Sequence, residues 1–285
     1  MVSIRQKSQA GNRCGSHDAT QIECKSMVEK SRSPIRDKPL RLPGQSLAKE
    51  REELVENAVG EPALLATFMI VLAGLEWWRF YSDMKPNPIL FTGGAVVATM
   101  YAAFRVWRAL PRIRNLKQGM EGERAVGQFL ERLREDGYQV FHDVVGDNFN
   151  VDHVLIGPAG VFTIETKTWS KPRSRNPELV FDGESIRLDA STPDRDPIVQ
   201  ARAQARWMRF ILAESTGRQF HVRPVIAFPG WFIQQTGASA DVWVLEPKAL
   251  RGFLSHESPA LSREDIKLAS FHLSRLIRTT EQQTS

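Results

Sequence analysis

Two uncharged, apolar stretches separated by a short polar turn constrain this chain more than any other feature. The first runs from Pro62 to Leu75, and the second runs from Pro86 to Phe104. A transmembrane helix needs about 20 mostly apolar residues, although about 17 can suffice. The second stretch is long enough by itself, and the first is long enough if its helix continues to Tyr81. The pair therefore predicts a transmembrane helical hairpin over residues 61–110.

The residues that follow the first stretch suit the end of a membrane span. Glu76 and Arg79 lie three positions apart, where side chains on a helix can pair. Trp77, Trp78 and Tyr81 are aromatic residues of the kind that gather at membrane interfaces. A helix that is apolar on all sides needs lipid or a large protein core around it. The alternative to a membrane anchor is therefore a helical hairpin buried in a soluble protein.

Basic residues after the second stretch predict the orientation of the hairpin. Positively charged flanks stay on the cytoplasmic side of a membrane. The N-terminal tail is also basic, so we expect an inner or cytoplasmic membrane protein with both termini in the cytoplasm. The cations after the second stretch have no acid among them, and they are Arg105, Arg108, Arg112, Arg114 and Lys117.

Residues 1–60 are polar and lack the apolar core of a signal peptide. We expect a mostly disordered cytosolic tail with a short helix near residues 46–58. Cys14 and Cys24 cannot build a disulfide framework, and with one histidine between them they fall short of a four-ligand zinc site. The net charge of +5 is spread along the chain, so charge neither predicts nor excludes a nucleic-acid partner.

Residues 115–285 have the patterns of a folded domain. The expected order is a helix, then a sheet of mainly antiparallel strands, then a closing helix, which indicates an α/β or α+β fold. The spacing of apolar residues and turn residues predicts helices over 121–135, 197–213 and 263–278, and strands over 138–145, 151–156, 161–167, 222–228 and 242–245.

The segment VDHVLIGPAGVFTIETK is where chemistry is expected. Its Gly-Pro-Ala-Gly turn predicts a β-hairpin in which Ile156 faces Val161. The same register sets Asp152 opposite Glu165 and places Lys167 on their face of the sheet. Two carboxylates that lie so close repel each other. Either the lysine or a divalent metal ion must compensate their charge.

Carboxylate oxygens are hard ligands that favour Mg²⁺ or Mn²⁺. The coordination shell of Mg²⁺ usually retains several water molecules and can include a phosphate oxygen of the substrate. A metal ion of this kind polarises a phosphoryl oxygen and lowers the pKa of its bound water. A lysine beside it can orient or deprotonate that water and offset developing negative charge. The alternative is a surface hairpin in which this common combination of residues is incidental.

Further motifs surround this hairpin in a fixed order. The sequence GMEGE at residues 119–123 opens the helix before it, and Asp-Pro at 196–197 with Gln200 opens the helix after it. Together, and as far as Phe-Pro-Gly at 228–230, they resemble the NERD (nuclease-related) domain of the PD-(D/E)xK nuclease-like superfamily. The sequence PGQSL at residues 43–47 also resembles a lead-in of membrane-anchored members. The resemblance implies a restriction-endonuclease-like mixed sheet flanked by helices.

The resemblance also implies roles for individual residues. Val151 stands where the family usually has isoleucine, a change within one apolar class, and no acidic or lysine position of the site is missing. The implied activity is metal-dependent hydrolysis of DNA at a membrane. The implied site consists of Glu123 as the helix acid, Asp152 and Glu165 as metal ligands, Lys167 as the catalytic lysine and Gln200 as a supporting polar residue.

Two groups of basic residues are candidates for contacts with DNA phosphates. Arg202, Arg206 and Arg209 form one stripe of an expected helix, and Lys171 and Arg173 closely follow the catalytic strand. Solvated surface charge is the alternative for each group.

Three aromatic side chains are expected to be structural. The hairpin register points His153 away from Asp152, and Trp207 and Phe210 have the helical spacing of core residues.

Three functions stay open at this point. The first is a membrane-anchored, Mg²⁺-dependent nuclease. The second is a catalytically inactive nuclease-like module that binds nucleic acid or a protein partner at the membrane, because nuclease-like folds also serve binding roles. The third is a scaffold whose main part is the membrane hairpin. Many enzymes of the superfamily act as pairs, so a homodimer is also open.

Overall fold

A computed structural model describes residues 40–82, 87–146, 149–170, 178–188, 196–237 and 241–283. The chain divides into two compact units, Met1–Arg36 and Asp37–Ser285, and all described residues belong to the second. The predictions for Cys14, Cys24 and the tail before residue 40 lie outside the described residues, as do those for Lys171 and Arg173.

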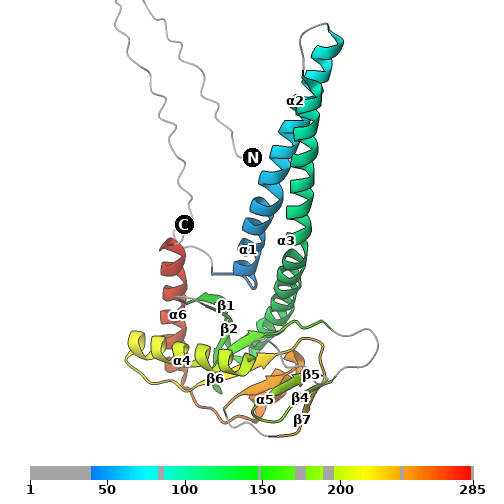
Figure 1. The fold of residues 1–285 in the computed structure, drawn as a ribbon. Helices are drawn as coiled ribbons and strands as arrows, with labels where there is room; N and C mark the ends of the chain where they lie inside the picture. Colours follow the sequence, from blue (N-terminus) through cyan, green and yellow to red (C-terminus); the bar gives the residue numbers. More distant parts are fainter. Residues whose placement is uncertain are drawn as a thin grey trace, which may run out of the picture. The chain divides into compact units, whose positions relative to one another are not determined.

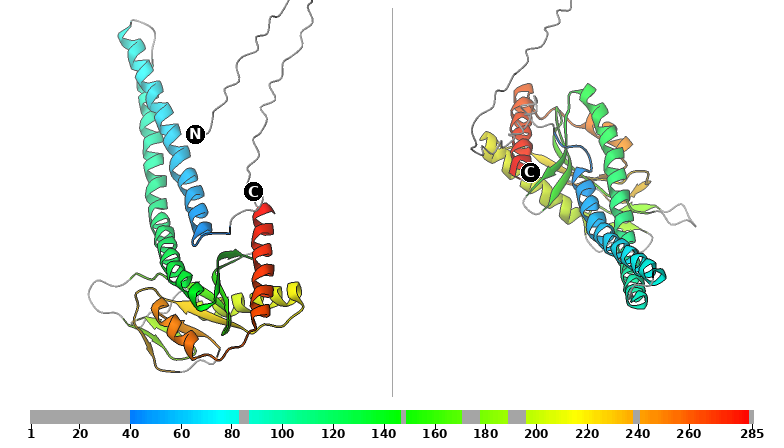
Figure 2. Two further views of the ribbon diagram at one scale, coloured as in Figure 1. Left: turned by 180° about the vertical axis from the view of Figure 1, so that it is seen from behind. Right: turned by 90° about the horizontal axis from the view of Figure 1, so that it is seen from above.

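Three helical segments precede the sheet. Helix α1 (Gln45–Val55) passes through one π-helical turn (Glu56–Gly60) into α2 (Glu61–Tyr81), and α3 (Pro88–Glu131) returns beside α2. Figures 1 and 2 show α2 and α3 side by side, and α1 also lies along α3. The short helix expected near 46–58 is thus the start of a longer helical run. Helix α3 continues without a break through residues 110–115, so the hairpin and the sheet domain share one helix.

Both apolar helices are long and apolar enough to cross a membrane. Their large apolar side chains, such as Leu64, Phe68, Ile89 and Val97, are exposed. A hairpin in the core of a soluble protein would have these side chains covered, and large exposed apolar surfaces mark sites of membrane or protein contact. Length, composition and exposure together favour membrane association of the hairpin.

Polar groups at the tip of the hairpin are paired with one another. The carboxylate of Glu76 accepts a hydrogen bond from Arg79 Nη1 at 2.7 Å and another from Asn87 N at 3.0 Å. The expected pairing of Glu76 with Arg79 is confirmed. The second contact satisfies a backbone N–H at the start of α3, where the helix itself offers no partner.

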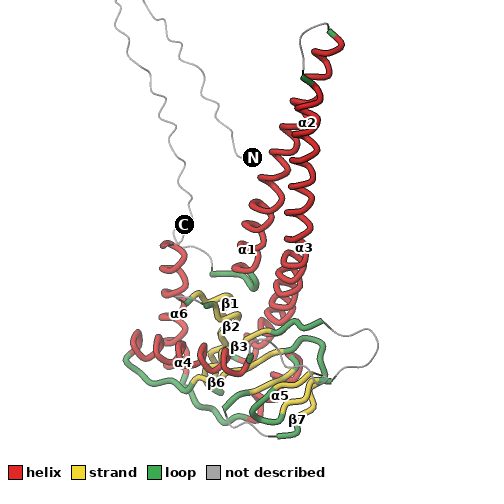
Figure 3. Tube along the Cα trace, viewed as in Figure 1, coloured by secondary structure: helices red, strands yellow, loops and turns green. Residues whose placement is uncertain are grey.

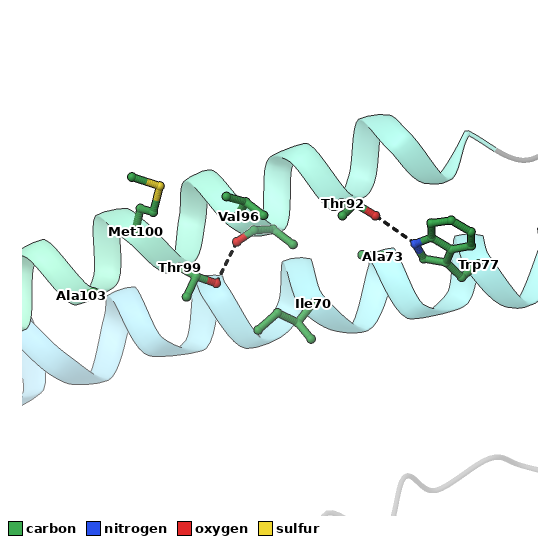
Figure 4. A pocket seen from close by; sticks show the side chains of 9 residues that line it. Ile70, Ala73, Trp77, Thr92, Val96, Thr99, Met100 and Ala103 are labelled. Carbon is green, nitrogen blue, oxygen red and sulfur yellow. Dashed lines mark hydrogen bonds between the residues drawn. The ribbon is translucent and has the colours of Figure 1, made fainter.

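An apolar groove of about 480 Å³ lies between α2 and α3. Its polar groups have partners inside the hairpin, as lipid would require. Trp77 Nε1 donates a hydrogen bond to Thr92 Oγ1 at 3.0 Å, and Thr99 Oγ1 donates one to Ala95 O at 2.8 Å (Figure 4). The groove is lined by Ile70, Ala73, Trp77, Thr92, Ala95, Val96, Thr99, Met100 and Ala103.

The main sheet has five strands in the order β1-β2-β3-β6-β8. The first three strands pair antiparallel, whereas β6 and β8 are added in parallel. The sheet is therefore mixed rather than mainly antiparallel, because helix α4 (Pro197–Thr216) carries the chain from β3 to a parallel neighbour. The strands are β1 (Gln139–Val145), β2 (Asn150–Gly157), β3 (Gly160–Thr166), β6 (Val222–Ala227) and β8 (Trp243–Leu245).

A second, smaller sheet has the order β5-β4-β7. No strand was predicted here, because three residues are too few to show a period of two. Its strands are β4 (Leu179–Phe181), β5 (Ile186–Leu188) and β7 (Ile233–Gln235).

Helices cover both faces of the main sheet (Figure 3). On one face, Leu130 of α3 and Leu254 of α5 (Leu250–His256) pack on Phe162. On the other face, Met208 of α4 and Leu273 of α6 (Arg263–Gln283) pack on the strands. Two short 3₁₀ helices, Arg132–Asp136 and Pro247–Ala249, complete the fold.

One predicted core residue is in solvent. Trp207 is half-buried and makes an edge-to-face contact with Phe149. Phe210, three positions later, is 63% exposed. The prediction for Phe210 was wrong, because α4 lies on the sheet along a narrower stripe, which contains Ala201, Ala205 and Met208.

Candidate active site

The chemistry-bearing hairpin folds as expected. Strands β2 and β3 pair in the predicted register, with Ile156 facing Val161. The pairing of the two strands ends at His153 and Ile164, one position before Asp152 and Glu165. There the backbone N–H of Thr166 donates a hydrogen bond to Asp152 Oδ2 at 2.7 Å. The two acids therefore lie at adjacent strand ends.

The carboxylate of Glu165 is buried and is the centre of a hydrogen-bonded group. Its Oε1 accepts from Lys167 Nζ at 2.7 Å and from Gln200 Nε2 at 2.8 Å, and its Oε2 accepts from Gln204 Nε2 at 2.6 Å. Lys167 Nζ also donates to Gln200 Oε1 at 2.9 Å. The structure thus brings together Glu165, Lys167 and Gln200, which the sequence analysis had selected.

Helix α4 supplies both glutamines. It begins at Pro197, because Asp196 Oδ1 accepts a hydrogen bond from Ile198 N at 2.8 Å and proline is favoured at the first helical position. Gln200 therefore lies in the first turn, close to the end of β3.

Gln204 is a site residue that the sequence analysis missed. It is buried, and its Nε2, which donates to Glu165, also donates a hydrogen bond to the carbonyl oxygen of Asn150 at 2.9 Å. Its own Oε1 is buried without a hydrogen-bond partner among the described residues. The available signal was the spacing of four from Gln200, which places both side chains on one face of the helix.

Glu123 reaches the site from α3. The helix approaches the end of β3 closely at Gly122, where a Cβ atom would lie 1.7 Å from Thr168 Cγ2. Gln118 Nε2 donates to the carbonyl oxygen of Thr168 at 2.7 Å and holds this contact. A larger residue at Gly122 would force either the side chain of Thr168 or α3 to shift.

Burial and like charges raise the pKa values of two of the acids. The pKa of Glu123 rises from 4.5 to about 8, first through burial and then through the carboxylates of Asp143 and Glu165. The pKa of Asp152 lies well above its usual value, first through burial and then through Glu165 and Glu123. Lys167 opposes both shifts, but one ammonium group does not balance three carboxyl groups. The acids therefore lie within electrostatic reach of one another, and a second cation would favour their ionised forms.

Two side chains of the site are of the type that a hard divalent cation takes. Asp152 and Glu165 offer carboxylate oxygens, and Mg²⁺ commonly takes one or two carboxylates and completes its shell with water and phosphate. Within the described parts of the chain, no group of three or more Asp, Glu, His or Cys side chains could hold a metal ion. Water or substrate would therefore fill the remaining coordination positions.

The basic residues predicted to contact DNA have different surroundings. Arg202 forms hydrogen bonds of 2.9 and 3.1 Å with Asp241. Arg206 and Arg209 are exposed on α4, next to the exposed ring of Phe210. Two of the three arginines in the stripe are therefore exposed to solvent.

Two histidines form a buried pair on the face of the sheet that α3 covers. The Nδ1 atoms of His142 and His153 lie 2.9 Å apart, and His142 Nε2 lies 2.9 Å from Glu131 Oε1. Burial lowers the pKa of both imidazoles, and for His153 the neighbouring His142 lowers it further. This environment agrees with the structural role predicted for His153.

Acid should destabilise the protein through this pair. Below the ordinary pKa of 6.5, the unfolded chain binds protons that the folded pair does not, so stability is full above pH 6.5 and falls as the pH drops toward the folded values. Each histidine contributes a slope of at most about 1.4 kcal/mol per pH unit. Urea unfolding of the full chain in detergent at pH 7.5 and 5.5 measures this contribution as the difference between the wild type and His153→Gln, because the buried acids of the site add a pH dependence of opposite sign to both proteins. The stability of the wild type relative to His153→Gln should fall from pH 7.5 to pH 5.5, and an unchanged difference would contradict the prediction.

The mixed sheet, its flanking helices and the site of two acids and a lysine define an α/β domain of the nuclease-related type. The family model of NERD, the nuclease-related domain, matches residues 118–229. This part of the chain is a NERD domain, and it contains all five predicted catalytic residues.

Two individual proteins are also similar to parts of the chain. An uncharacterized protein of Bacillus anthracis is 37% identical over 57 residues, which cover 18% of this chain and 27% of that protein. The chain thus spans about a quarter of the relative's length. Protein VC1899 from Vibrio cholerae, known from a crystal structure, has 11% sequence identity with this chain. The match covers 83% of this chain and 58% of the VC1899 chain, with a TM-score of 0.25. At that score the likeness adds nothing to the fold assignment.

Proposed function

We propose that this protein is a membrane-anchored nuclease that hydrolyses DNA phosphodiester bonds with the help of Mg²⁺ or Mn²⁺. The observation that carries the proposal is the group formed by Glu165, Lys167 and Gln200 beside Asp152, inside a NERD domain. A metal-dependent nuclease needs carboxylates for the metal ion and a cation beside the phosphate, and this group supplies residue types suited to both tasks.

Each residue of the group has a distinct task. Asp152 and Glu165 would hold the divalent ion, which when bound supplies Lewis-acid polarisation of the phosphate and a more acidic water. Gln200 and Gln204 orient the carboxylate of Glu165 through both of its oxygens. Lys167 is directed by Glu165 and Gln200, so its ammonium group can orient the attacking water and offset charge that develops on the phosphate.

Surface charge and the hairpin supply the remaining parts of the proposal. Arg202, Arg206 and Arg209 on α4, together with Lys171 and Arg173, would contact DNA phosphates without sequence preference. Helices α2 and α3 would anchor the domain in the cytoplasmic membrane, with both termini in the cytoplasm, because the cations follow the second span. A homodimer belongs to the proposal in the same way, by analogy with the superfamily.

A cleavage assay on the full chain in nanodiscs tests the proposal. Plasmid DNA should be cut with Mg²⁺ or Mn²⁺ and left intact with EDTA, and Asp152→Asn should lower the rate at least about 100-fold. The control is Arg218→Lys, which changes an exposed pair with Asp265. Cleavage that survives EDTA, or that Asp152→Asn leaves unchanged, would contradict metal-dependent hydrolysis.

A binding-only module is the second candidate. It is favoured by the absence, within the described residues, of a cluster of three or more metal-binding side chains. It predicts salt-sensitive DNA binding that neither EDTA nor Asp152→Asn changes, with no cleavage under any metal condition. A module that binds only a protein partner would show neither DNA binding nor DNA cleavage.

A further inference from the structure

A short segment before the hairpin packs against the NERD domain. This segment, Arg41–Ser46, is called the strap, and it lies beside β1 (Figures 1 and 2). Arg41 Nε and Nη2 donate to Asp143 Oδ2 at 3.0 and 2.7 Å, and the backbone N–H of Ser46 donates to the same oxygen at 2.8 Å. Arg41 Nη2 also donates to Ser46 Oγ at 2.8 Å. One carboxylate on β1 thus holds both ends of the strap.

Asp143 has an unusual position for an acid. It is 2% exposed, and a buried carboxylate is costly unless it is paired. It is the one non-glycine residue within the described ranges with a positive φ, which is 50°. Such conformations concentrate at functional sites, where the surrounding structure maintains them. On β1 it falls between residues that pair with Val151 and His153, so it stands across from Asp152.

The middle of the strap contacts α3 on both sides of Glu123. Gly44 has φ 72°, and a Cβ atom there would lie 3.1 Å from Met120 Cγ. Gly44 thus lies beside the turn of α3 that carries Glu123, and its backbone N–H lowers the pKa of that acid. Pro43 packs over Gly127, where a Cβ atom would lie 2.7 Å from Pro43 Cγ. Two glycines therefore allow the strap and α3 to approach each other closely.

We propose that the strap completes the active site by positioning the side chain of Glu123 through the amide of Gly44, with Asp143 holding the strap in place through Arg41. Asp143 and Arg41 are then positioning residues that act on the reaction through Glu123. The PGQS sequence before the hairpin becomes part of the site instead of a linker. Since the strap continues directly into α1, the membrane anchor and the acid on α3 are mechanically connected. The effect on catalysis rests on the proposed nuclease function, whereas the docking of the strap does not.

Hydrogen exchange tests the docking of the strap without any catalysis. In the full chain in nanodiscs, the amide of Gly44 should be protected, and Asp143→Asn should speed its exchange at least tenfold. Arg41→Lys keeps the charge but loses the two-pronged contact with Asp143, so it should speed the exchange as well and serves if Asp143→Asn does not fold. Arg218→Lys, in an exposed pair far along the sequence, should change nothing in the strap. Unchanged exchange in both strap variants would overturn the proposal.

A double-mutant cycle tests the effect on the reaction. Asp143→Asn should lower kcat about tenfold or more, while KM for DNA stays within about twofold, because a misplaced catalytic group slows the chemical step. In the background of Glu123→Gln, Asp143→Asn should cause no further loss, since both changes act through one side chain. Additive losses, or a Glu123→Gln variant with unchanged kcat, would overturn the positioning role. If the wild type cuts no DNA, the proposed function fails, and the exchange rates still decide whether the strap docks.

Discussion

Replacement of Lys167 by alanine is expected to lower kcat for DNA cleavage by about 100- to 1,000-fold, the usual loss when one charge-stabilising donor is removed from an active site. The ammonium group is oriented by Glu165 at 2.7 Å and by Gln200 at 2.9 Å. In the variant, both partners remain, but the ammonium group that would offset charge on the phosphate in the transition state is lost. Single-turnover cleavage of a labelled duplex by the full chain in nanodiscs measures the loss.

The matched control is another lysine-to-alanine change. Lys248 is exposed in the short helix Pro247–Ala249, outside the residues that match the NERD family, so Lys248→Ala should cleave at the wild-type rate. Thermal unfolding of both variants separates lost chemistry from lost folding. A Lys167→Ala enzyme that keeps a rate within about threefold of the wild type would rule out this lysine as the catalytic cation.

Replacement of Glu123 by glutamine is expected to stabilise the metal-free protein at high pH. The pKa of this buried acid is raised from 4.5 to about 8, so the folded chain holds the proton more tightly than the unfolded chain does. The stability from this group is full below pH 4.5 and is lost as the pH rises toward 8. A difference of about 3.5 between the two pKa values is worth about 5 kcal/mol. The glutamine variant does not pay to ionise a buried group.

Urea unfolding in EDTA at pH 5, 7 and 9 gives the slope of the unfolding free energy against pH for the variant and the wild type. Asp152 adds a slope of the same sign to both proteins, so only the difference between the two slopes reports on Glu123. Glu121→Gln changes an exposed acid on the same helix and should keep the wild-type slope. If Glu123→Gln and the wild type lose stability equally between pH 5 and 9, Glu123 is not the buried acid that resists ionisation.

Local patterns were sufficient where neighbours in sequence decide the geometry. The turn between β2 and β3 and the alternation of side chains predicted the register that pairs Ile156 with Val161, which is confirmed. The contact between Glu165 and Lys167 follows from their spacing of two. The apolar runs likewise predicted α2 and the first half of α3. In each case the period of a strand or helix carries the information, and both ends of the contact lie in one motif.

Contacts between distant elements were not predictable in the same way. Gln204 meets Glu165 only because α4 crosses the sheet at that point. The strap meets Asp143 across 102 positions of sequence. The continuity of α3 through residues 110–115 joins what looked like two domains. None of these contacts has a periodic signal, because each depends on how separate elements pack against one another.

The sequence by itself determined the NERD motif order, the apolar hairpin and the identity of the acids and the lysine, since these are properties of residue type and spacing. The tertiary structure alone decided which groups from different elements touch and which charges are buried. It placed Gln204 beneath Glu165 and brought the strap to Glu123. Burial and packing arise from the whole fold, and they set the pKa of an acid and the orientation of a lysine more strongly than the residues beside them in the chain.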